Sequence, residues 1–141
     1  SFGKRVVILG GGLVGCETAI WLRQQGREVA VVEMQGDFAG DAPIFHKIAV
    51  RLQMEELGVD LRLNTTAAAI TDEGLVGRTR DGDEILFPAD TILCSAGMRA
   101  RHQLVASLLP LAPEVYPVGD CVRAGQVFWA VSGGYFAALD L

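Results

Sequence analysis

The stretch VVILGGGLVGCE, residues 6–17, places hydrophobic residues directly before three consecutive glycines and helix-forming residues directly after them. Residues 5–9 have the character of a short buried strand, and residues 13–25 show the apolar spacing of an amphipathic helix. Gly26 stands where a glycine commonly ends a helix. Residues 28–33, EVAVVE, indicate a second strand. The opening of the chain therefore predicts one strand–helix–strand unit.

Three of the early glycines have the spacing G-x-G-x-x-G between the predicted strand and helix. In such a turn one glycine permits the tight bend, a second lets a pyrophosphate approach the backbone, and a third lets helix and strand pack closely. The free N–H groups and the positive dipole end of the helix can then receive the phosphates. The predicted phosphate site consists of Gly10, Gly11, Gly12, Leu13, Val14 and Gly15.

An acidic residue, Glu33, ends the second predicted strand eighteen residues after Gly15. A carboxylate at this position can accept hydrogen bonds from a ribose 2′-hydroxyl, and Met34 beside it joins the predicted site. The same carboxylate would repel the 2′-phosphate of NADP, and the following residues MQGDFAG contain no Lys or Arg. We therefore expect NAD(H). A purely structural glycine turn and a solvated acid at a strand end remain the alternatives.

The rest of the first hundred residues continues the alternation of helix and strand. The expected elements are a helix that starts at Asp41-Ala42-Pro43 and ends at Gly58, a strand at 59–63, an antiparallel meander at 67–88 with Asp81-Gly82 as a hairpin turn, and a buried strand at 91–97. Within the helix, Ile44, Phe45, Ile48, Ala49, Leu52 and Leu57 recur at helical spacing. The expected fold is α/β: a Rossmann-like parallel sheet flanked by helices, with a three-stranded antiparallel meander, in three layers. Ala67, after the third strand, is a candidate floor for an adenine pocket.

The C-terminal part of the chain differs in composition and in residue pattern from the first hundred residues. Prolines interrupt residues 108–117, which indicates a linker, while 114–120 reads as a short strand and 126–141 as an apolar helix interrupted by Gly133-Gly134. We expect two domains, residues 1–107 binding NAD(H) and residues 108–141 forming a linker with a terminal strand and helix. Aromatic residues crowd the last segment, so residues 113–141 are expected to fold back onto the sheet or to pair with another copy.

Composition limits the classes of partner. The chain has 141 residues and a formal net charge of −5, which argues against nucleic acid. No apolar stretch approaches the roughly 20 residues of a membrane helix, and no signal-peptide pattern opens the chain. Three cysteines without a C-x-x-C pair favour a reducing, cytoplasmic setting. Neither histidine has neighbours at metal-ligand spacing, so no metal is expected, and no set of catalytic side chains is apparent.

Three segments resemble the two-dinucleotide-binding-domain flavoproteins, the pyridine-nucleotide-dependent flavin oxidoreductases. GGGLVGCETA is similar to that family's nicotinamide-domain motif, which implies that Glu17 lies near the nicotinamide. ILCSAGMRA is similar to the segment beside the bound nucleotide, which implies contacts from Ala96, Gly97 and Met98. VYPVGD resembles the family's second flavin segment, which implies that Gly119 and Asp120 bind the ribityl or pyrophosphate portion of FAD.

The C-terminal segment is most similar to bacterial NADH:flavin oxidoreductases of the 2,4-dienoyl-CoA reductase and 2-enoate reductase type. The resemblance implies a parent enzyme with FAD, FMN and an iron–sulfur cluster, whose flavin-binding domains on the same polypeptide are the partners of this chain. The chain has one glycine fingerprint where the family has two, and it has no redox cysteine pair. We therefore expect a fragment that positions the nicotinamide for hydride transfer to a flavin and is inactive alone.

Two other functions stay open at this point. The single fingerprint could bind FAD itself, in which case the purified chain would be yellow. The chain could also be a non-enzymatic nucleotide-sensing domain, since a fold does not dictate a function.

Overall fold

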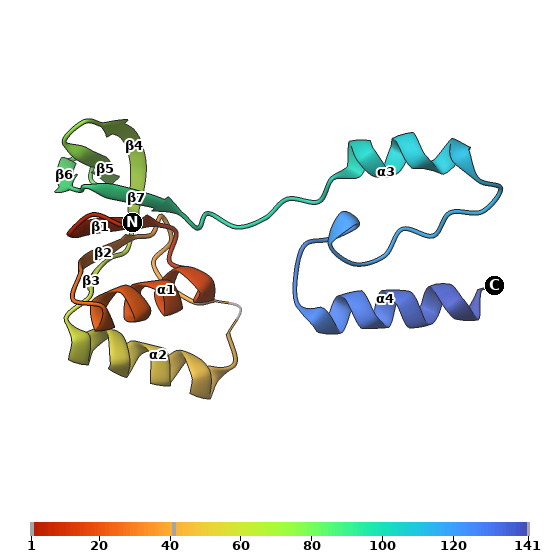
Figure 1. Cartoon of the computed structure of the whole chain (residues 1–141), viewed down its shortest axis with the longest axis horizontal. Coiled ribbons are helices and arrows are strands. Elements are labelled where there is room, and N and C mark those ends of the chain that lie inside the picture. The colour runs from red at the N-terminus through yellow and green to blue at the C-terminus, as the bar shows by residue number, and fades with distance from the viewer. Residues whose placement is uncertain (1, 41, 141) are drawn as a thin grey trace. The chain divides into compact units, whose positions relative to one another are not determined.

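The computed structural model describes residues 2–40 and 42–140, and the chain forms two compact units that meet in sequence at Gly97 and Met98 (Figure 1). The structure groups residues 98–107 with the second unit, whereas the sequence assigned them to the first domain. Each unit is described by itself below.

The first unit is built on a parallel sheet with the strand order β3-β2-β1-β7. Its strands are β1 (Arg5–Leu9), β2 (Glu28–Val32), β3 (Asp60–Arg62) and β7 (Thr91–Cys94). Leu9 at the end of β1 is in register with Val32 on one side and Cys94 on the other. The carboxyl ends of the strands are therefore level, and the connections that follow them leave from one edge of the sheet.

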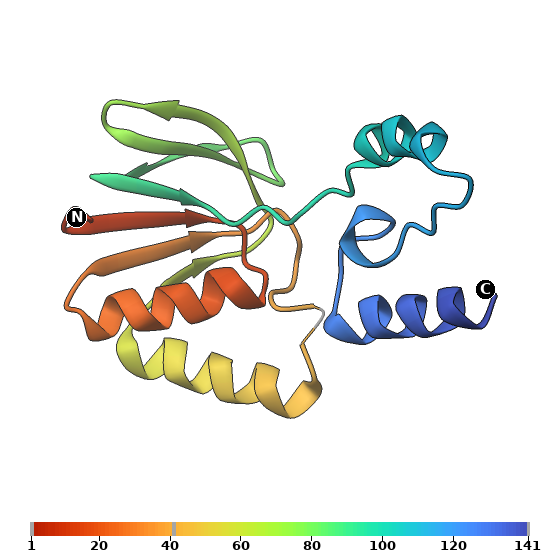
Figure 2. The same cartoon turned by 45° about the vertical axis from the view of Figure 1, so that its right-hand side comes forward.

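Two helices cover one face of this sheet and a second sheet covers the other (Figures 1 and 2). The helices are α1 (Leu13–Gln24) and α2 (Ile44–Leu57), and the second sheet consists of the antiparallel strands β4 (Thr65–Thr71), β5 (Gly74–Thr79) and β6 (Glu84–Pro88). Because successive strand residues face opposite sides, Val6 and Ile8 pack with the helices while Val7 packs with Leu75 and Phe87 of the second sheet. The three-layer α/β prediction is confirmed.

The helix α1 follows the predicted pattern closely. Cys16, Ala19 and Leu22 are buried on its inner face. Gly26, just past its end, has a φ of +75°, a conformation that costs glycine little. Gly58 ends α2 in the same way with a φ of +68°. Asp41, part of the predicted helix start, lies outside the described residues. None of the described helices is long and apolar enough to cross a membrane.

The apolar spacing in α2 does not mark its buried face. Ile44, Phe45, Ile48 and Leu52 are exposed, with 83% of Phe45 accessible, whereas Val50 and Met54 are buried. The helix carries two apolar stripes, and packing against α1 selects the one that includes Val50 and Met54.

The second unit contains α3 (His102–Leu108), short 3₁₀ turns at Leu109–Leu111 and Gly119–Cys121, and α4 (Val127–Leu139). The strand predicted at 114–120 is wrong, since the described part of this unit contains no strand. A strand needs a neighbour for its hydrogen bonds, and none is provided here. Helix α4 continues through Gly133-Gly134, while Leu141 of the predicted helix lies outside the described residues.

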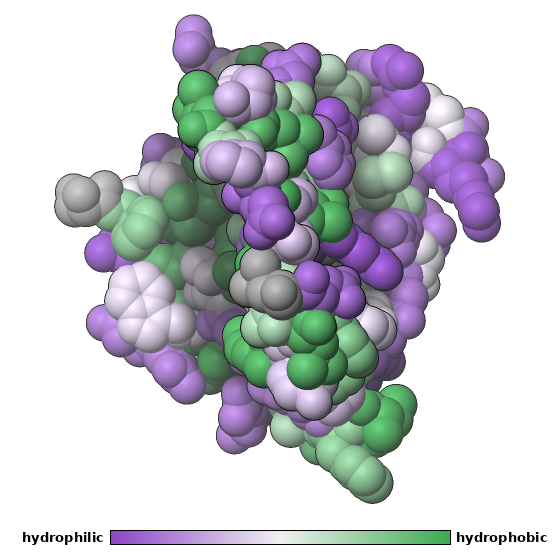
Figure 3. Space-filling model, turned by 90° about the vertical axis from the view of Figure 1, so that its right-hand side faces the viewer, coloured by the Kyte–Doolittle hydropathy of each residue, from purple (hydrophilic) through white to green (hydrophobic). Residues whose placement is uncertain are grey.

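Hydrophobic side chains lie at the surface of the second unit (Figure 3). No described residue after Gly97 is buried, and Phe128, Tyr135 and Phe136 of α4 are each more than half exposed. This unit therefore has no core comparable to that of the first.

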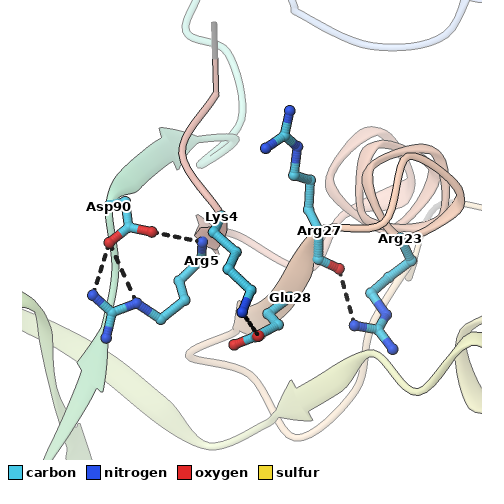
Figure 4. A network of polar contacts seen from close by, with 6 residues as sticks. All are labelled: Lys4, Arg5, Arg23, Arg27, Glu28 and Asp90. Atoms are coloured by element: carbon cyan, nitrogen blue, oxygen red, sulfur yellow. Dashed lines mark hydrogen bonds and ion pairs between the residues drawn. The ribbon is translucent and has the colours of Figure 1, made fainter.

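Polar contacts tie the strands together at the edge where they begin (Figure 4). The Arg5 Nη2 atom lies 2.7 Å from Asp90 Oδ1, and the Arg5 backbone N–H donates to Asp90 Oδ2 at 2.8 Å. Lys4, just before β1, pairs with Glu28 at the start of β2, with 3.3 Å between Lys4 Nζ and Glu28 Oε1. The guanidinium of Arg5 lowers the pKa of the Asp90 carboxyl to about 2, first through the side-chain hydrogen bond. This edge is fixed by side chains, whereas the opposite edge carries the glycine loop.

Candidate dinucleotide-binding site

Close packing requires two glycines of the fingerprint, Gly10 in the loop between β1 and α1 and Gly15 in the first turn of α1. Gly10 has a φ of +110°, and a Cβ atom there would lie 2.3 Å from the Ser95 carbonyl oxygen. A Cβ atom on Gly15 would lie 2.1 Å from the Gly10 carbonyl oxygen. The absence of side chains at these positions brings α1 close to β1 and β7.

The second glycine of the fingerprint, Gly12, lies in open space. It is the N-cap of α1 with a φ of −65°, and no side chain caps the helix. A Cβ atom on Gly12 would have no described heavy atom within 4 Å beyond its chain neighbours. Packing within the protein does not explain a glycine here, whereas close approach by a ligand does. The N–H groups of the first helical turn have no partners within the helix and are accessible to an anion.

The Glu33 side chain is held against this loop. Its Oε2 atom accepts the Gly11 N–H at 2.7 Å, and its Oε1 atom accepts the Gln35 N–H at 2.8 Å. An ionised carboxylate can accept about four hydrogen bonds, so capacity remains for hydroxyl donors of a ligand. The Gly11 carbonyl in turn accepts the Ala39 N–H at 2.7 Å. The acid and the glycine loop are therefore positioned as one rigid group.

Cys16 packs against the glycine loop, and its thiol is expected to react slowly. Its Sγ atom donates to the Gly11 carbonyl at 3.4 Å, and its side chain is fully buried. Burial, followed by the charges of Glu33 and Glu17, raises the pKa of this thiol to about 11. All three cysteines are free, so the described residues hold no disulfide.

A cleft of about 500 Å³ opens at the edge of the sheet where the strands end. Its lining comes from the ends of β1, β2 and β7, the start of β4 and the residues that follow these strands: Leu9, Gly10, Gly12, Val32, Glu33, Met34, Gln35, Thr65, Thr66, Ala67, Ser95, Ala96 and Gly97. In open parallel sheets, ligands bind at this edge, where neighbouring connections diverge.

The cleft brings together about half of the predicted site residues, and others lie beside it. The predicted residues that line it are Gly10, Gly12, Glu33, Met34, Ala67, Ala96 and Gly97. Gly11 contributes through its hydrogen bond to Glu33. Leu13, Val14 and Gly15 form the first turn of α1 and do not line the cleft. Their role in holding phosphates stays a prediction.

The remaining predicted residues lie elsewhere. Glu17 does not line the cleft, and its Oε1 atom lies 3.1 Å from His46 Nε2 of α2. Met98 and Asp120 line a separate hollow of about 490 Å³ within the second unit, and Gly119 lines another hollow of that unit. Their proposed contacts with nicotinamide or flavin stay predictions.

Sequence reasoning missed several residues of the lining: Leu9, Val32, Gln35, Thr65, Thr66 and Ser95. A positional signal was available for some of them, because the last residue of each parallel strand and the residue after it border this edge. Thr65 and Thr66 carry no such signal, since they line the cleft through the turn into the second sheet.

Known proteins place the chain in a family. The pyridine nucleotide-disulphide oxidoreductase family matches residues 1–134. Cinnamate reductase from Clostridium sporogenes is 33% identical over 144 residues, with 100% of this chain and 22% of that protein covered. NADH oxidase from Thermoanaerobacter brockii is 31% identical over 144 residues, with the same coverage of 100% and 22%.

Solved structures agree with this assignment. A 2-naphthoyl-CoA reductase superposes with a TM-score of 0.85 and 32% identity over 96% of this chain and 21% of that chain. Histamine dehydrogenase from Rhizobium sp. 4-9 shares the fold, with a TM-score of 0.82 at 23% identity over 99% of this chain and 22% of its own. The chain spans about a fifth of the length of these relatives. The resemblance to pyridine-nucleotide-dependent flavin oxidoreductases is confirmed, and the chain belongs to the pyridine nucleotide-disulphide oxidoreductase family.

Proposed function

We propose that this chain binds NAD(H) in the cleft of its first unit and positions the nicotinamide for hydride transfer to a flavin held by other parts of a larger enzyme. The observation that carries the proposal is the 2.7 Å hydrogen bond from the Gly11 N–H to the Glu33 carboxylate. This bond holds the Glu33 carboxylate, which could accept ribose hydroxyls, beside a helix N-terminus whose N–H groups could receive phosphates.

The pyrophosphate would lie on the loop at Gly12. The open space at Gly12 allows phosphate oxygens to approach the N–H groups at the start of α1 without displacing a side chain. The partial positive charge of the helix terminus stabilises the two negative charges of a dinucleotide. Gly10 and Gly15 hold this loop against β7 but need not touch the ligand.

Glu33 supports a preference for NAD(H) over NADP(H). Hydroxyl groups of the adenosine ribose can donate to the acceptor positions that Gly11 and Gln35 leave free. A 2′-phosphate at the same position would bring its negative charge against the carboxylate, and such repulsion at close range in a partly enclosed site is costly. The expected difference in affinity is about tenfold or more.

The cleft provides binding and orientation but no acid–base chemistry. Glu33 is the only ionisable side chain among its lining residues, and it is engaged by backbone N–H groups. The bound cofactor itself supplies the hydride. Ala96 and Gly97, at the end of β7, would border the nicotinamide side. The chain alone should therefore bind the cofactor without turnover.

The other domains and cofactors of the larger enzyme are proposed from the relatives. The relatives include a cinnamate reductase and an NADH oxidase, each about five times the length of the matched region. We propose that flavin-binding segments of the same polypeptide contact the exposed apolar residues of the second unit, where Asp120 would face FAD. FMN, an iron–sulfur cluster, self-association through residues 113–141 and a cytoplasmic location stay predictions.

Calorimetry with NADH and NADPH tests the proposal. The chain should bind NADH more tightly than NADPH. Glu33→Gln should reduce the difference between the two affinities, because it removes the negative charge while keeping one acceptor oxygen for the loop. Glu28→Gln is the matched control, because Glu28 begins β2, the strand that Glu33 follows, and pairs with Lys4 at the opposite edge of the sheet. Equal affinity for both nucleotides in the unsubstituted chain would remove the role of Glu33. Visible absorbance of a copurified flavin would favour FAD in the cleft instead.

A further inference from the structure

A second, smaller hollow continues the cleft beyond Glu33. It has a volume of about 280 Å³ and is lined by Met34, Gln35, Gly36, Asn64, Thr66, Thr79 and Arg80. Met34, Gln35 and Thr66 line both spaces, so the two hollows adjoin. Arg80 is the only charged residue of this lining, and it comes from the connection between β5 and β6.

The Arg80 side chain is available for a ligand. Within the described part of the chain, no hydrogen bond or ion pair engages its guanidinium. Nearby arginines differ in this respect, because Arg78 binds Glu84 at 2.8 Å and Arg62 binds Asp60 at 2.7 Å. Arg80 is exposed, so its guanidinium is free to contact a ligand in the hollow that it lines.

We propose that Arg80 binds the adenine ring of the dinucleotide, with its planar guanidinium against the ring. This inference rests on the proposed function, because it takes the direction of the ligand from it. With the phosphates at Gly12 and the ribose at Glu33, the base must lie further along the same wall. The next residues along that wall are Met34 and Gln35, which also line the second hollow.

The lining suits a flat, neutral base. Met34 is 68% exposed, so its thioether can cover one face of the ring. Arg80 can stack on an aromatic face through its delocalised charge, as arginine does with nucleic-acid bases. Gln35, Asn64 and Thr66 offer donors and acceptors for the polar edge of adenine.

The surroundings of Arg80 argue against a 2′-phosphate as its ligand. Glu33 borders the ribose position with an anionic carboxylate. Asp81 follows Arg80 directly in the chain and Asp83 comes two residues later, so further negative charges lie close to Arg80 in sequence. Stacking on a neutral ring tolerates these acids, whereas binding of a phosphate dianion does not.

Titration calorimetry of the full chain tests the inference with NADH, NADPH and reduced nicotinamide mononucleotide, which lacks adenine. Arg80→Ala should weaken NADH binding about three- to fivefold, the range expected for an exposed cation–π contact. Arg80→Lys should restore only part of this loss, because an ammonium has no planar face. Binding of the mononucleotide should not change. Arg78→Ala is the matched control, since Arg78 lies near the end of β5, two residues before Arg80, and lines neither hollow.

The outcomes separate this inference from the proposed function. If the unsubstituted chain binds NADH and Arg80→Ala binds it equally well, Arg80 has no adenine role while the function stands. If Arg80→Ala weakens NADPH alone, the residue serves a 2′-phosphate and the inference is overturned. If the unsubstituted chain does not bind NADH at all, both proposals fail together.

Discussion

Gly12→Ala should abolish most of the affinity for NADH and leave the fold intact. The backbone at Gly12 has a φ of −65° and a ψ of 172°, which alanine adopts without strain. Apart from its chain neighbours, the added methyl group would meet no described heavy atom of the protein within 4 Å. It would instead occupy the space above the helix N-terminus where we place the pyrophosphate.

The size of the effect follows from this geometry. Alanine is a poorer N-cap than glycine, but it also reduces the entropy of the unfolded chain, so the free energy of unfolding should change by no more than about 1 kcal/mol. In the complex, the methyl group would hold phosphate oxygens out of hydrogen-bond range of the first-turn N–H groups. Loss of two such bonds to a charged group costs about 3 kcal/mol, which corresponds to a decrease in affinity of about 100-fold.

The assay pairs calorimetric titration with NADH and urea unfolding, and two glycine variants calibrate it. Gly40→Ala is the matched control, because a Cβ atom there also meets no described atom within 4 Å and Gly40 does not line the cleft. Gly15→Ala should behave oppositely: its methyl group would clash with the Gly10 carbonyl, which costs about 1–3 kcal/mol of stability. If Gly12→Ala folds and binds NADH within threefold of the unsubstituted chain, the phosphates do not lie on this loop.

Two further predictions concern the support of the sheet and loop. Alkylation at neutral pH should label the exposed Cys94 well before Cys16, because burial raises the pKa of the Cys16 thiol to about 11. In the unfolded chain the pKa of Cys16 is near its ordinary value of 9.0, so the free energy of unfolding should fall as pH rises from about 9 to about 11. Cys16→Ala should make this fall smaller. Alkylation of Cys16 as fast as Cys94 would contradict the burial of Cys16. Asp90→Asn should lower the urea midpoint at pH 7, because the ionised Asp90 stabilises the folded chain above its unfolded pKa of 3.8. That stabilisation is lost as pH falls through about 2, so the two proteins should converge there, and a constant difference across the titration would exclude the Arg5 pair as its source.

The sequence predicted the first strand–helix–strand unit well because its determinants are local. A glycine at φ +110° and a helix end at Gly26 depend on backbone preferences of single residues. The prediction of Glu33 as a binding residue likewise needed only its place at the end of a strand. Its hydrogen bond to Gly11 holds it beside the glycine loop, and its contact with ribose stays a prediction.

Residues that border the site from the second sheet were harder to predict. Thr66 and Arg80 reach the cleft region because β4 and β5 pair in a specific register and pack over the parallel sheet. Nothing in the local sequence around Arg80 distinguishes it from Arg78, which forms an ordinary cross-strand pair. Arg80, which we propose contacts adenine, and Arg78, which pairs with Glu84, differ in their three-dimensional neighbours.

The error at residues 114–120 has a general physical cause. The segment EVYPVGD has an apolar pattern, but a strand is a relation between two segments, and its backbone groups must be paired by a neighbour. A sequence encodes the capacity to pair, and the structure shows whether a partner is in place. The exposed residues of α4 have the same origin: Phe128 and Tyr135 are suited to burial but contact no core in their own unit. The apolar composition of the second unit therefore supports the proposal that other segments contact its exposed residues, and residues 114–120 could pair as a strand if such a segment supplied the missing hydrogen bonds.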